Sequence, residues 1–286
     1  MRKVTVAATQ MACSWDRQAT LDKAESLVRK AAGQGANIIL LQELFETPYF
    51  PQQQDFKYYD LAKKLEDDPA IQRFTKVAKE LQVVLPISFY EKTDTTQFNS
   101  IAIIDADGQI LGVYRKTHIP DGLPYAEKFY FTPGDTGFKV WQTKYGRIGV
   151  GICWDQWFPE AARAMALLGA ELLFYPTAIG NEPTLKIDSS IHWRNTIAGH
   201  AAANMVPVVI SNRIGKEAEG GTEMSFYGQS FIADNNGVIV ERLDDHTEGV
   251  VLHTFDLDQL DKERRDWGIY RDRRPDMYKV LTTRGI

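Results

Sequence analysis

The sequence predicts a single α/β domain with two sheets whose outer faces are covered by helices. Three observations favour this fold class. Apolar strand-like runs alternate with helix-like periodicity in both halves of the 286-residue chain. Turn signals such as Asp107-Gly108 separate neighbouring strands at hairpin spacing. No linker rich in Pro, Gly and Ser divides the chain. We therefore interpret residues 1–286 as one domain.

The first half opens with a strand, a helix and a second strand. An apolar run over residues 4–9 predicts a buried strand, and apolar residues at helical spacing then continue as far as Gly33 and Gly35. A strand over residues 38–42 ends at Glu43, where a loop rich in Pro and aromatic residues begins. Ligand sites collect at such carboxyl ends of strands in open α/β sheets. The later elements of this half are a helix over 68–81 and strands over 83–90, 100–104 and 110–115.

The second half repeats this alternation. Pro159 suits the first turn of a helix, and Gly169 suits its C-terminal end. After Leu260 the chain becomes polar and arginine-rich, so residues 261–286 are expected to form a tail that is solvated or packs on a partner subunit. The predicted helices cover 159–168 and 189–204, and the predicted strands cover 147–152, 172–176, 207–211, 225–233, 238–242 and 249–256.

Composition excludes several classes of protein. Hydrophobic residues at 44% and charged residues at 25% are typical of soluble globular chains, which excludes disordered, coiled-coil and collagen-like classes. The 33 Lys and Arg against 38 Asp and Glu give a net charge of -5. Nucleic-acid binding is therefore not expected, and a cationic small substrate is favoured over an anionic one. The most apolar stretch, 164–175, is shorter than the roughly 20 residues that cross a bilayer, so no membrane segment is expected.

The cysteine and histidine content argues against disulfides and metals. Cys13 and Cys153 are the only two cysteines, which is too few for a disulfide framework and lacks the spacing of a zinc site. The five histidines are scattered along the chain without close pairing. We therefore expect no metal and no organic cofactor. The reducing cytoplasm is the expected location.

Cys153 occupies a position that suits a nucleophile. It follows the glycine-spaced strand 148–152 and precedes a helix that starts at Pro159. A strand-to-helix turn presents a side chain beside backbone N–H groups, as a nucleophile with an oxyanion hole requires. The alternative is simple packing, because free cysteine is among the most buried residue types. Cys13 has no such context and is interpreted as a packing residue.

A cysteine nucleophile needs a helper, because a free thiol is only a few per cent thiolate at neutral pH. One candidate is His118, close to the end of a strand, whereas His192 lies in an amphipathic helix and is interpreted as structural. Another is a carboxylate with a lysine, since Glu43 and Lys116 both end strands. Glu127 is a further acid, set among aromatic residues where its charge needs a partner. Each charge taken singly fits a solvated loop residue, and both helper arrangements stay open at this point.

Three short motifs occur in order along the chain. They are Leu41-Gln42-Glu43-Leu44-Phe45, Tyr114-Arg115-Lys116-Thr117-His118-Ile119-Pro120 and Gly151-Ile152-Cys153-Trp154-Asp155. A further segment, 127–134, lies between the second and the third. Together they resemble the nitrilase superfamily of carbon-nitrogen hydrolases over nearly the whole chain. The resemblance implies a four-layer α-β-β-α sandwich of two mixed sheets, no cofactor, and homo-oligomers built from dimers.

The same resemblance implies a Glu-Lys-Cys triad carried by Glu43, Lys116 and Cys153, with Glu127 in support. Glu43 would take the thiol proton during attack, return a proton to the departing nitrogen and later activate water. Lys116, kept protonated by flanking carboxylates, would stabilise the oxyanion together with the backbone N–H of Trp154. These roles suit the chemistry of each side chain.

Finer matches narrow the expected substrate. They comprise 153–163, 177–183, 211–217, 226–228 and 271–275. These segments resemble the branch of the superfamily that hydrolyses N-carbamoylputrescine to putrescine, carbon dioxide and ammonia in polyamine biosynthesis from agmatine. The expected substrate is therefore a small ureido or amide compound with a cationic tail. Another aliphatic amidase or carbamoylase is one alternative, and a catalytically silent binding subunit is another.

An ammonium tail needs a carboxylate at the far end of its pocket, across an apolar or aromatic wall. Glu182 is the first candidate for that carboxylate, with Asp188 and Glu217 behind it. Asp188 also precedes a predicted helix and has an alternative interpretation as its N-cap. The candidates for the other substrate contacts are Tyr49, Tyr125 and Trp154.

Overall fold

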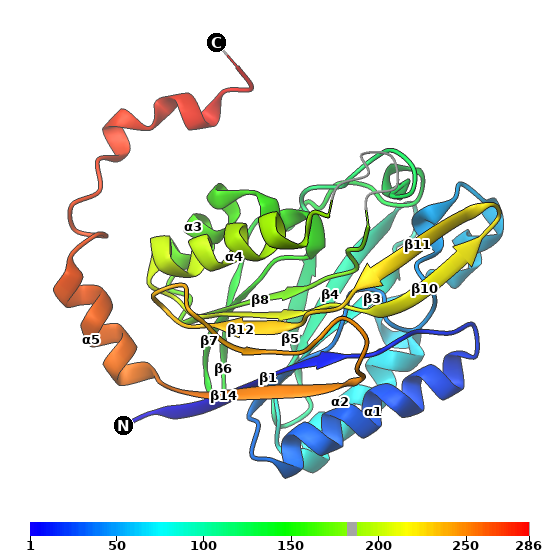
Figure 1. Ribbon diagram of the computed structural model, residues 1–286, viewed down its shortest axis with the longest axis horizontal. Coiled ribbons are helices and arrows are strands. Elements are labelled where there is room, and N and C mark those ends of the chain that lie inside the picture. The colour runs from blue at the N-terminus through cyan, green and yellow to red at the C-terminus, as the bar shows by residue number, and fades with distance from the viewer. Residues whose placement is uncertain (182–187, 286) are drawn as a thin grey trace.

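Two sheets lie face to face between two pairs of helices in the computed structural model, which describes residues 1–181 and 188–285. One pair consists of α1 (Arg17–Gly33) and α2 (Pro69–Leu81). The other consists of α3 (Pro159–Leu167) and α4 (Ser190–Asn204). Figure 1 shows α3 and α4 above the sheets and α1 and α2 below them. This α-β-β-α layering confirms the predicted fold class.

The first sheet combines two groups of three strands. One group is β14 (Gly249–Asp256), β1 (Lys3–Gln10) and β2 (Ile38–Leu40), and the other is β3 (Leu85–Lys92), β4 (Gln97–Ile104) and β5 (Ile110–Arg115). β1 pairs antiparallel with β14 and parallel with β2. A parallel bridge between Ile38 and Val84 joins the groups, so that the ends of β2 and β5 belong to one layer.

The second sheet has six strands in the order β13-β12-β9-β8-β7-β6. Their bounds are Ile239–Arg242, Phe231–Ala233, Val208–Ser211, Leu172–Pro176, Gly146–Val150 and Val140–Thr143, respectively. β7, β8 and β9 are parallel neighbours. A separate hairpin is formed by β10 (Ile214–Glu219) and β11 (Thr222–Tyr227).

Three apolar layers hold the sandwich together. Ile101 of the first sheet and Phe174 of the second belong to the core between the sheets. Phe74 of α2 packs in the layer below the first sheet, and Trp193 of α4 packs in the layer above the second. Because each sheet buries both faces, its central strands are apolar at nearly every position, as strands buried on both sides are. The continuous apolar runs in the sequence have this cause.

The structure adds elements that periodicity did not predict. The run over residues 225–233 is two strands, because Gly228 and Gln229 have φ angles of +52° and +59° and turn the chain between them. β6 and β10 were not predicted, and neither was α5 (Leu257–Trp267). α5 buries only Leu257 among its described residues, so it lacks the apolar stripe that signals a helix.

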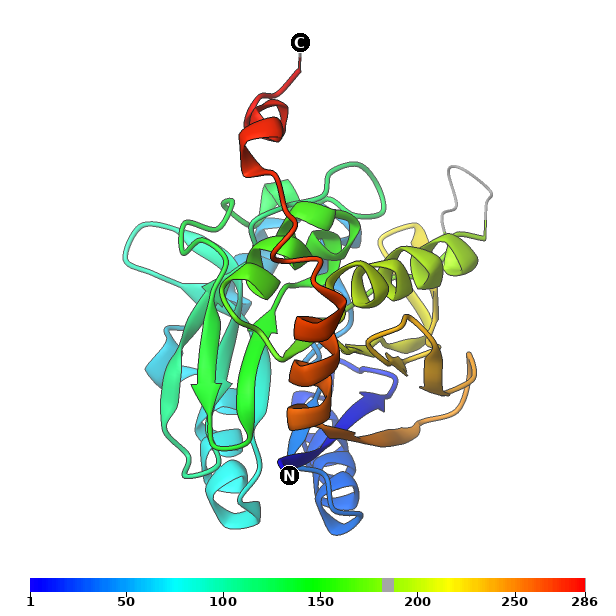
Figure 2. The same ribbon diagram turned by 90° about the vertical axis from the view of Figure 1, so that its left-hand side faces the viewer.

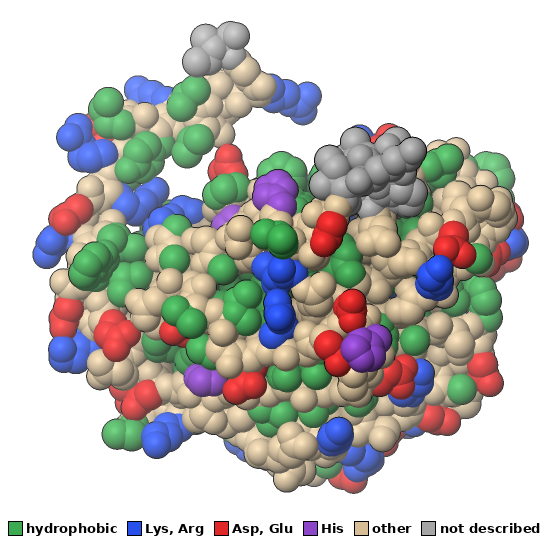
Figure 3. Space-filling model, viewed as in Figure 1, with side chains coloured by type: hydrophobic (Ala, Val, Ile, Leu, Met, Phe, Trp, Pro, Cys, Tyr) green, Lys and Arg blue, Asp and Glu red, His purple; other side chains and the backbone are tan. Residues whose placement is uncertain are grey.

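The chain beyond α5 projects from the sandwich. Figures 1 and 2 show it, in orange and red, leaving the body beside α3 and α4. Figure 3 shows hydrophobic and basic side chains exposed along this projection. Across the described residues, no helix is both long and apolar enough to cross a membrane.

Candidate active site

Four of the predicted site residues lie at chain turns that converge between the two sheets. Glu43 follows β2, Lys116 follows β5, Glu127 begins a short 3-10 turn over 127–129, and Cys153 follows β7. The first three side chains are completely buried, and Cys153 is 6% exposed. Glu43, Lys116 and Glu127 are close enough to Cys153 for their charges to act on its thiol.

Lys116 lies at the centre of this group. Its Nζ is 2.7 Å from Glu43 Oε1 and 2.9 and 2.7 Å from Glu127 Oε1 and Oε2. Burial alone would lower the pKa of Lys116, but the charges of Glu127 and Glu43 outweigh it, and the pKa is raised. The buried ammonium therefore stays protonated and remains available to a developing negative charge.

Glu127 is the second carboxylate that binds the ammonium group of Lys116. Besides its two contacts with Lys116, Glu127 Oε1 accepts a hydrogen bond of 2.5 Å from the Tyr49 hydroxyl. Burial raises the pKa of Glu127 to about 7, although the charge of Lys116 opposes this rise. The three donated hydrogen bonds fix the carboxylate, which in turn fixes the direction of the lysine.

The two oxygens of Glu43 have different surroundings. Oε1 accepts from Lys116 Nζ and from Asn99 Nδ2, each at 2.7 Å. Oε2 is buried and has no hydrogen-bond partner within residues 1–181 and 188–285. A buried carboxylate oxygen without a donor is suited to receive a proton. Oε2 is therefore the oxygen of Glu43 that is free to act on the thiol.

Arg213 binds the main chain at Glu43. This buried guanidinium donates through Nη2 to the carbonyl oxygens of Glu43 at 2.8 Å and of Leu44 at 3.0 Å. Leu44 itself has a φ of +46°, a conformation that a branched side chain rarely adopts. The carbonyl contacts stabilise this tight turn and thereby fix the position from which the carboxylate of Glu43 extends.

Cys153 stands on a strained turn. Its φ is +40°, in the left-handed region that residues other than glycine rarely occupy, and it begins the 3-10 turn Cys153–Trp157. Gly151, just before it, has no room for a side chain, because a Cβ there would lie 2.8 Å from the ring of Tyr175. The glycine spacing in the sequence thus reflects the close packing of β7 on β8.

The thiol of Cys153 is protonated at rest. Burial raises its pKa well above the usual range, the charge of Glu43 raises it further, and Lys116 only partly opposes these effects. Attack by this sulfur therefore requires a base that takes the proton as the new bond forms. Glu43, whose charge acts on the thiol, is the residue that the sequence predicts for this role.

Asp155 joins the turn of Cys153 to the chain around Lys116. Its carboxylate accepts from Ile152 N at 2.9 Å, from His118 N at 3.0 Å and from the Tyr114 hydroxyl at 2.7 Å. Ile152 directly precedes the cysteine, and Tyr114 and His118 stand two residues on either side of the lysine. One buried carboxylate thus connects β5 of the first sheet with β7 of the second.

The geometry favours Lys116 over His118 as the helper of the thiol. Nδ1 of His118 lies 2.7 Å from Asp155 Oδ1, and its ring stacks on Phe158 with centroids 3.6 Å apart. These contacts give the imidazole a structural place in the link between the sheets. His192 is exposed, with its ring 4.9 Å from that of Trp157.

The predicted aromatic wall lies beside the charged group. Tyr49 meets the edges of Tyr125 and Phe226, each with centroids 5.9 Å apart. The carbonyl oxygen of Ala178, a member of the same apolar cluster, is 3.9 Å from Cys153 Sγ. Trp154 is 37% exposed and packs against Trp157. The remaining cluster members are Met224 and, partly buried, Tyr125.

The structure describes two of the three acids that were predicted to bind an amine, Asp188 and Glu217. Glu182 lies outside the described residues. Asp188 Oδ1 accepts from Ser190 N at 2.9 Å just before α4, whose N-cap position is Ser189 and not Asp188. The carboxylate of Glu217 accepts from Arg213 Nη1 at 2.9 Å and from Tyr49 N at 2.5 Å. These bonds hold the Tyr49 loop, and the amine-binding role of Glu217 stays a prediction.

Sequence reasoning did not identify Asn99, Arg213 or Asp155 as parts of the site. Asn99 carries a weak signal, since it is a buried amide that lies just before the apolar run 101–104 of β4. Asp155 and Arg213 fall inside motifs that were used only for the resemblance. Their partners lie far away in the sequence, so no local pattern assigns them a role.

Comparison with known proteins agrees with this geometry. The family model for carbon-nitrogen hydrolases matches residues 5–265. An N-carbamoylputrescine amidase of Arabidopsis thaliana is 58% identical, covering 99% of this chain and 96% of that protein. A citrullinase of Francisella tularensis is 50% identical, covering 98% and 99%. A solved carbon-nitrogen hydrolase from Helicobacter pylori has a TM-score of 0.92 and 38% identity, covering 99% of this chain and 100% of that one. The chain therefore belongs to the carbon-nitrogen hydrolase family.

Proposed function

We propose that this protein is a cysteine-dependent amidohydrolase that converts N-carbamoylputrescine and water to putrescine, carbon dioxide and ammonia. The observation that carries the proposal is the buried Lys116, held between Glu43 and Glu127 beside the protonated thiol of Cys153. The substrate is drawn from the relative of 58% identity, which matches over nearly the full length of both chains. The reaction needs a reduced thiol, which fits a reducing compartment such as the cytoplasm.

The first half of the reaction forms a covalent intermediate. The sulfur of Cys153 bonds to the ureido carbonyl carbon while its proton passes to Glu43 Oε2. Lys116 Nζ stabilises the resulting oxyanion, and one such donor in a dry site contributes about 3 to 4 kcal/mol to the rate. A carbon-nitrogen bond then breaks, and Glu43 returns the proton to the departing nitrogen. The product of this half is a carbamoyl group linked to the sulfur.

The second half releases that group. Glu43 takes a proton from water as the water oxygen bonds to the carbonyl carbon, and Lys116 again meets the oxyanion. The carbon-sulfur bond breaks, the sulfur regains a proton, and the carbamate that leaves decomposes to carbon dioxide and the remaining amine or ammonia. One carboxylate thus serves every proton transfer, which explains why its Oε2 must stay without a protein partner.

A second candidate substrate is citrulline, because the citrullinase is 50% identical over nearly all of this chain. Citrulline carries the same ureido group on a tail that adds a carboxylate to the amine. That carboxylate would need a cationic partner. Arg213, the arginine nearest to Tyr49, has its charge opposed by Glu217 and is engaged with main-chain oxygens. This neutralisation and the aromatic wall favour the simple alkylammonium tail.

The substrate assay has a clear expected result. Ammonia release from N-carbamoylputrescine should exceed release from citrulline, and from a neutral ureido compound of equal length, by about tenfold or more in kcat/KM. The reason is that a hydrogen bond to a charged group contributes about 1.5 to 3 kcal/mol, whereas a neutral tail lacks it. Equal cleavage of all three compounds would replace the proposal with a general ureido amidase.

Glu182→Gln refines this assay, since Glu182 is the first candidate from the sequence. The substitution should raise KM for N-carbamoylputrescine more than for the neutral compound, because only the charged tail loses a partner. Asp188→Asn is the matched control, because Asp188 binds the main chain of Ser190 at the start of α4 and should affect both substrates alike. Equal responses to Glu182→Gln would assign that residue to the shape of its loop.

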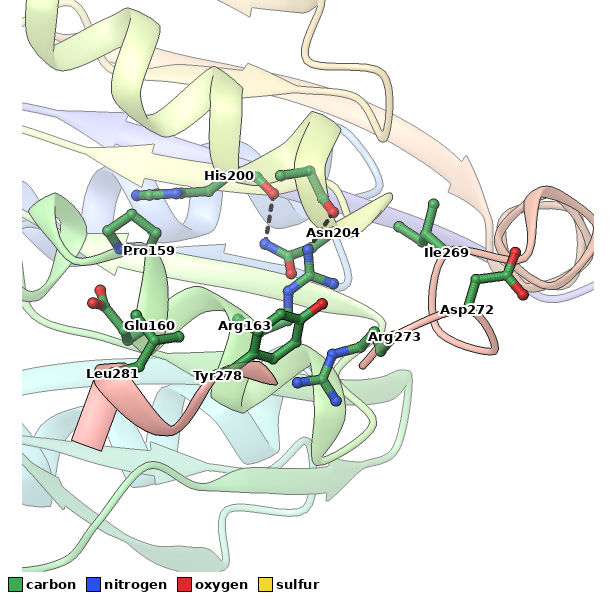
Figure 4. A pocket seen from close by; sticks show the side chains of 11 residues that line it. Pro159, Glu160, Arg163, His200, Asn204, Ile269, Asp272, Arg273, Tyr278 and Leu281 are labelled. Atoms are coloured by element: carbon green, nitrogen blue, oxygen red, sulfur yellow. Dashed lines mark hydrogen bonds between the residues drawn. The ribbon is translucent and has the colours of Figure 1, made fainter. Parts of the chain in front are cut away.

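We also propose that the protein assembles through its projecting tail. The tail carries exposed apolar side chains, Met277, Tyr278, Val280 and Leu281, which are 39 to 67% exposed. Figure 4 shows Tyr278 and Leu281 facing Glu160 and Arg163 of α3 across a cleft of about 550 Å³. Exposed apolar residues on an extended segment are typical of an interface with a second chain.

Light scattering should therefore show a dimer or a larger assembly at micromolar concentration. Leu281→Asp should weaken that assembly, because it places a charge in the apolar part of the interface. Phe56→Asp is a matched control at a side chain that is 74% exposed and far from the tail in the sequence. A monomeric full-length chain, or equal effects of the two substitutions, would rule out the tail as the interface.

A further inference from the structure

A buried amide on β4 contacts the carboxylate that the proposed reaction uses as its base. Asn99 is completely buried, and its Nδ2 donates to Glu43 Oε1 at 2.7 Å. Its main-chain oxygen accepts a hydrogen bond of 2.8 Å from Lys116 N. One residue of β4 therefore fixes the side chain of the glutamate and the main chain of the lysine.

The orientation of this amide leaves an acceptor unpaired. Asn99 Oδ1 is buried and has no hydrogen-bond partner in the described part of the chain. Rotating the amide by 180° would place Oδ1 against Glu43 Oε1, so that two acceptors would face each other. Ile101, two positions along β4, is apolar, and an apolar residue at 99 would likewise avoid the unpaired oxygen. The fold alone therefore gives no reason for an amide at this position.

The contact has a direct consequence for Glu43. Two donors, Lys116 Nζ and Asn99 Nδ2, occupy Oε1, and this leaves Oε2 as the oxygen without a donor. A hydrogen bond donated to a carboxylate also favours its charged form over its protonated form. The amide thus selects Oε2 as the proton-accepting oxygen of Glu43.

We propose that Asn99 is a positioning residue for the base of the reaction, which holds Glu43 with Oε2 turned toward the thiol of Cys153. This inference rests on the proposed function, because it assigns Asn99 a role in the same proton transfers. It predicts that Asn99 affects kcat and the pH profile, with little effect on KM, since the amide itself does not touch the substrate.

Two substitutions test the role in different ways. Asn99→Leu removes the donor without adding charge, and Asn99→Asp replaces the donor with a group of the same shape that repels Glu43. We expect kcat to fall by about a hundredfold in each, with KM changed by less than about threefold. The acid limb of the kcat/KM profile should move to higher pH, by about half a unit for Asn99→Leu and about one unit for Asn99→Asp.

The substitutions at Asn99 leave the other charged groups around Glu43 in place. The titratable and charged groups that act on it are Lys116, Glu127, Cys153, Tyr49 and Arg213. Ser100→Ala is the matched control, because Ser100 is equally buried on β4 and donates to Glu91 Oε2 at 2.6 Å, away from the reacting groups. It should keep kcat within about threefold and leave the pH profile in place.

Two results would overturn the proposal. One is an Asn99→Leu enzyme that keeps kcat within threefold of the starting protein. The other is a fall in kcat with an unmoved acid limb in a variant that unfolds at the same temperature as Ser100→Ala. Either result would assign Asn99 to packing.

A substrate-free measurement separates this inference from the proposed function. Labelling of Cys153 by iodoacetamide, followed against pH in a Cys13→Ala background, should shift to higher pH in Asn99→Asp, because the added charge reaches the thiol through Glu43. If the starting protein hydrolyses no ureido compound but this shift occurs, the proposed substrate is wrong and the role of Asn99 stands. If hydrolysis occurs and the shift does not, the role of Asn99 is wrong.

Discussion

Cys153→Ala should abolish turnover and leave the folded structure intact. The substitution removes one sulfur atom from a site that is 6% exposed, so the surrounding packing changes little. The sulfur is, however, the atom that bonds to the carbonyl carbon. Loss of a nucleophile costs on the order of 10⁴-fold or more in kcat, because the remaining groups cannot form the covalent intermediate. Ammonia release and thermal unfolding of the same preparation measure the two effects.

Cys13→Ala is the control for this experiment. Cys13 is half-buried, and its thiol has a pKa raised to about 11 by burial. The charges that act on it are those of Arg213, Glu217, Lys23 and Glu248, and not those of Glu43 and Lys116. Activity should stay within about twofold of the starting protein. Because burial raises the pKa of both thiols, selective labelling of Cys153 would reflect the proton transfer to Glu43 and not a larger resting thiolate fraction. A Cys153→Ala enzyme that keeps more than a few per cent of the activity of the unsubstituted protein would rule out the covalent mechanism.

Lys116→Ala should produce the next largest loss. It removes the oxyanion donor and leaves Glu43 and Glu127 buried without the positive charge between them. One donor of this kind contributes about 3 to 4 kcal/mol, so kcat should fall at least about a hundredfold. Lys116→Met fills more of the space and should lose a similar factor, which separates lost chemistry from lost packing. Both rates are read from the substrate assay.

His118→Ala completes that comparison. Its imidazole contacts Asp155 and Phe158, so its loss should loosen the link between the sheets and reduce kcat by less than about tenfold. The ranking of the two alanine variants decides between the helpers. A larger loss for His118→Ala than for Lys116→Ala would restore the Cys-His pair.

The sequence was informative where a functional residue ends a strand. Glu43, Lys116 and Cys153 each follow an apolar run, and the structure brings these three predicted residues together. Glu127 was assigned through the family resemblance, and the structure places it against Lys116 and the hydroxyl of Tyr49. The layers of the fold followed from the same apolar periodicity, because burial of both sheet faces dictates it.

The sequence was uninformative where the site depends on distant pairs. Asn99 and Glu43 are 56 residues apart in the sequence, and Arg213 and Glu43 are 170 residues apart. No local pattern in the sequence can therefore predict either contact. The ion pair between Glu217 and Arg213 was not predicted either, because it becomes visible only when the loop of Tyr49 packs beside β10. α5 was not predicted because it has almost no apolar face, and its sequence therefore shows no helical periodicity of apolar residues.

The hydrogen bonds of Asp155 have a consequence for folding. Lys116 and Glu43 extend from the first sheet and Cys153 from the second, and the Asp155 carboxylate connects the two. Each sheet can acquire its own hydrogen-bonded ladder before the other arrives, but the reacting atoms meet only when the layers dock. Such long-range docking is among the slow, late events in chain assembly. A chain in which the two sheets have not yet docked would have nearly complete secondary structure and no reaction centre. The rate at which activity returns after refolding therefore measures the rate at which the two sheets dock.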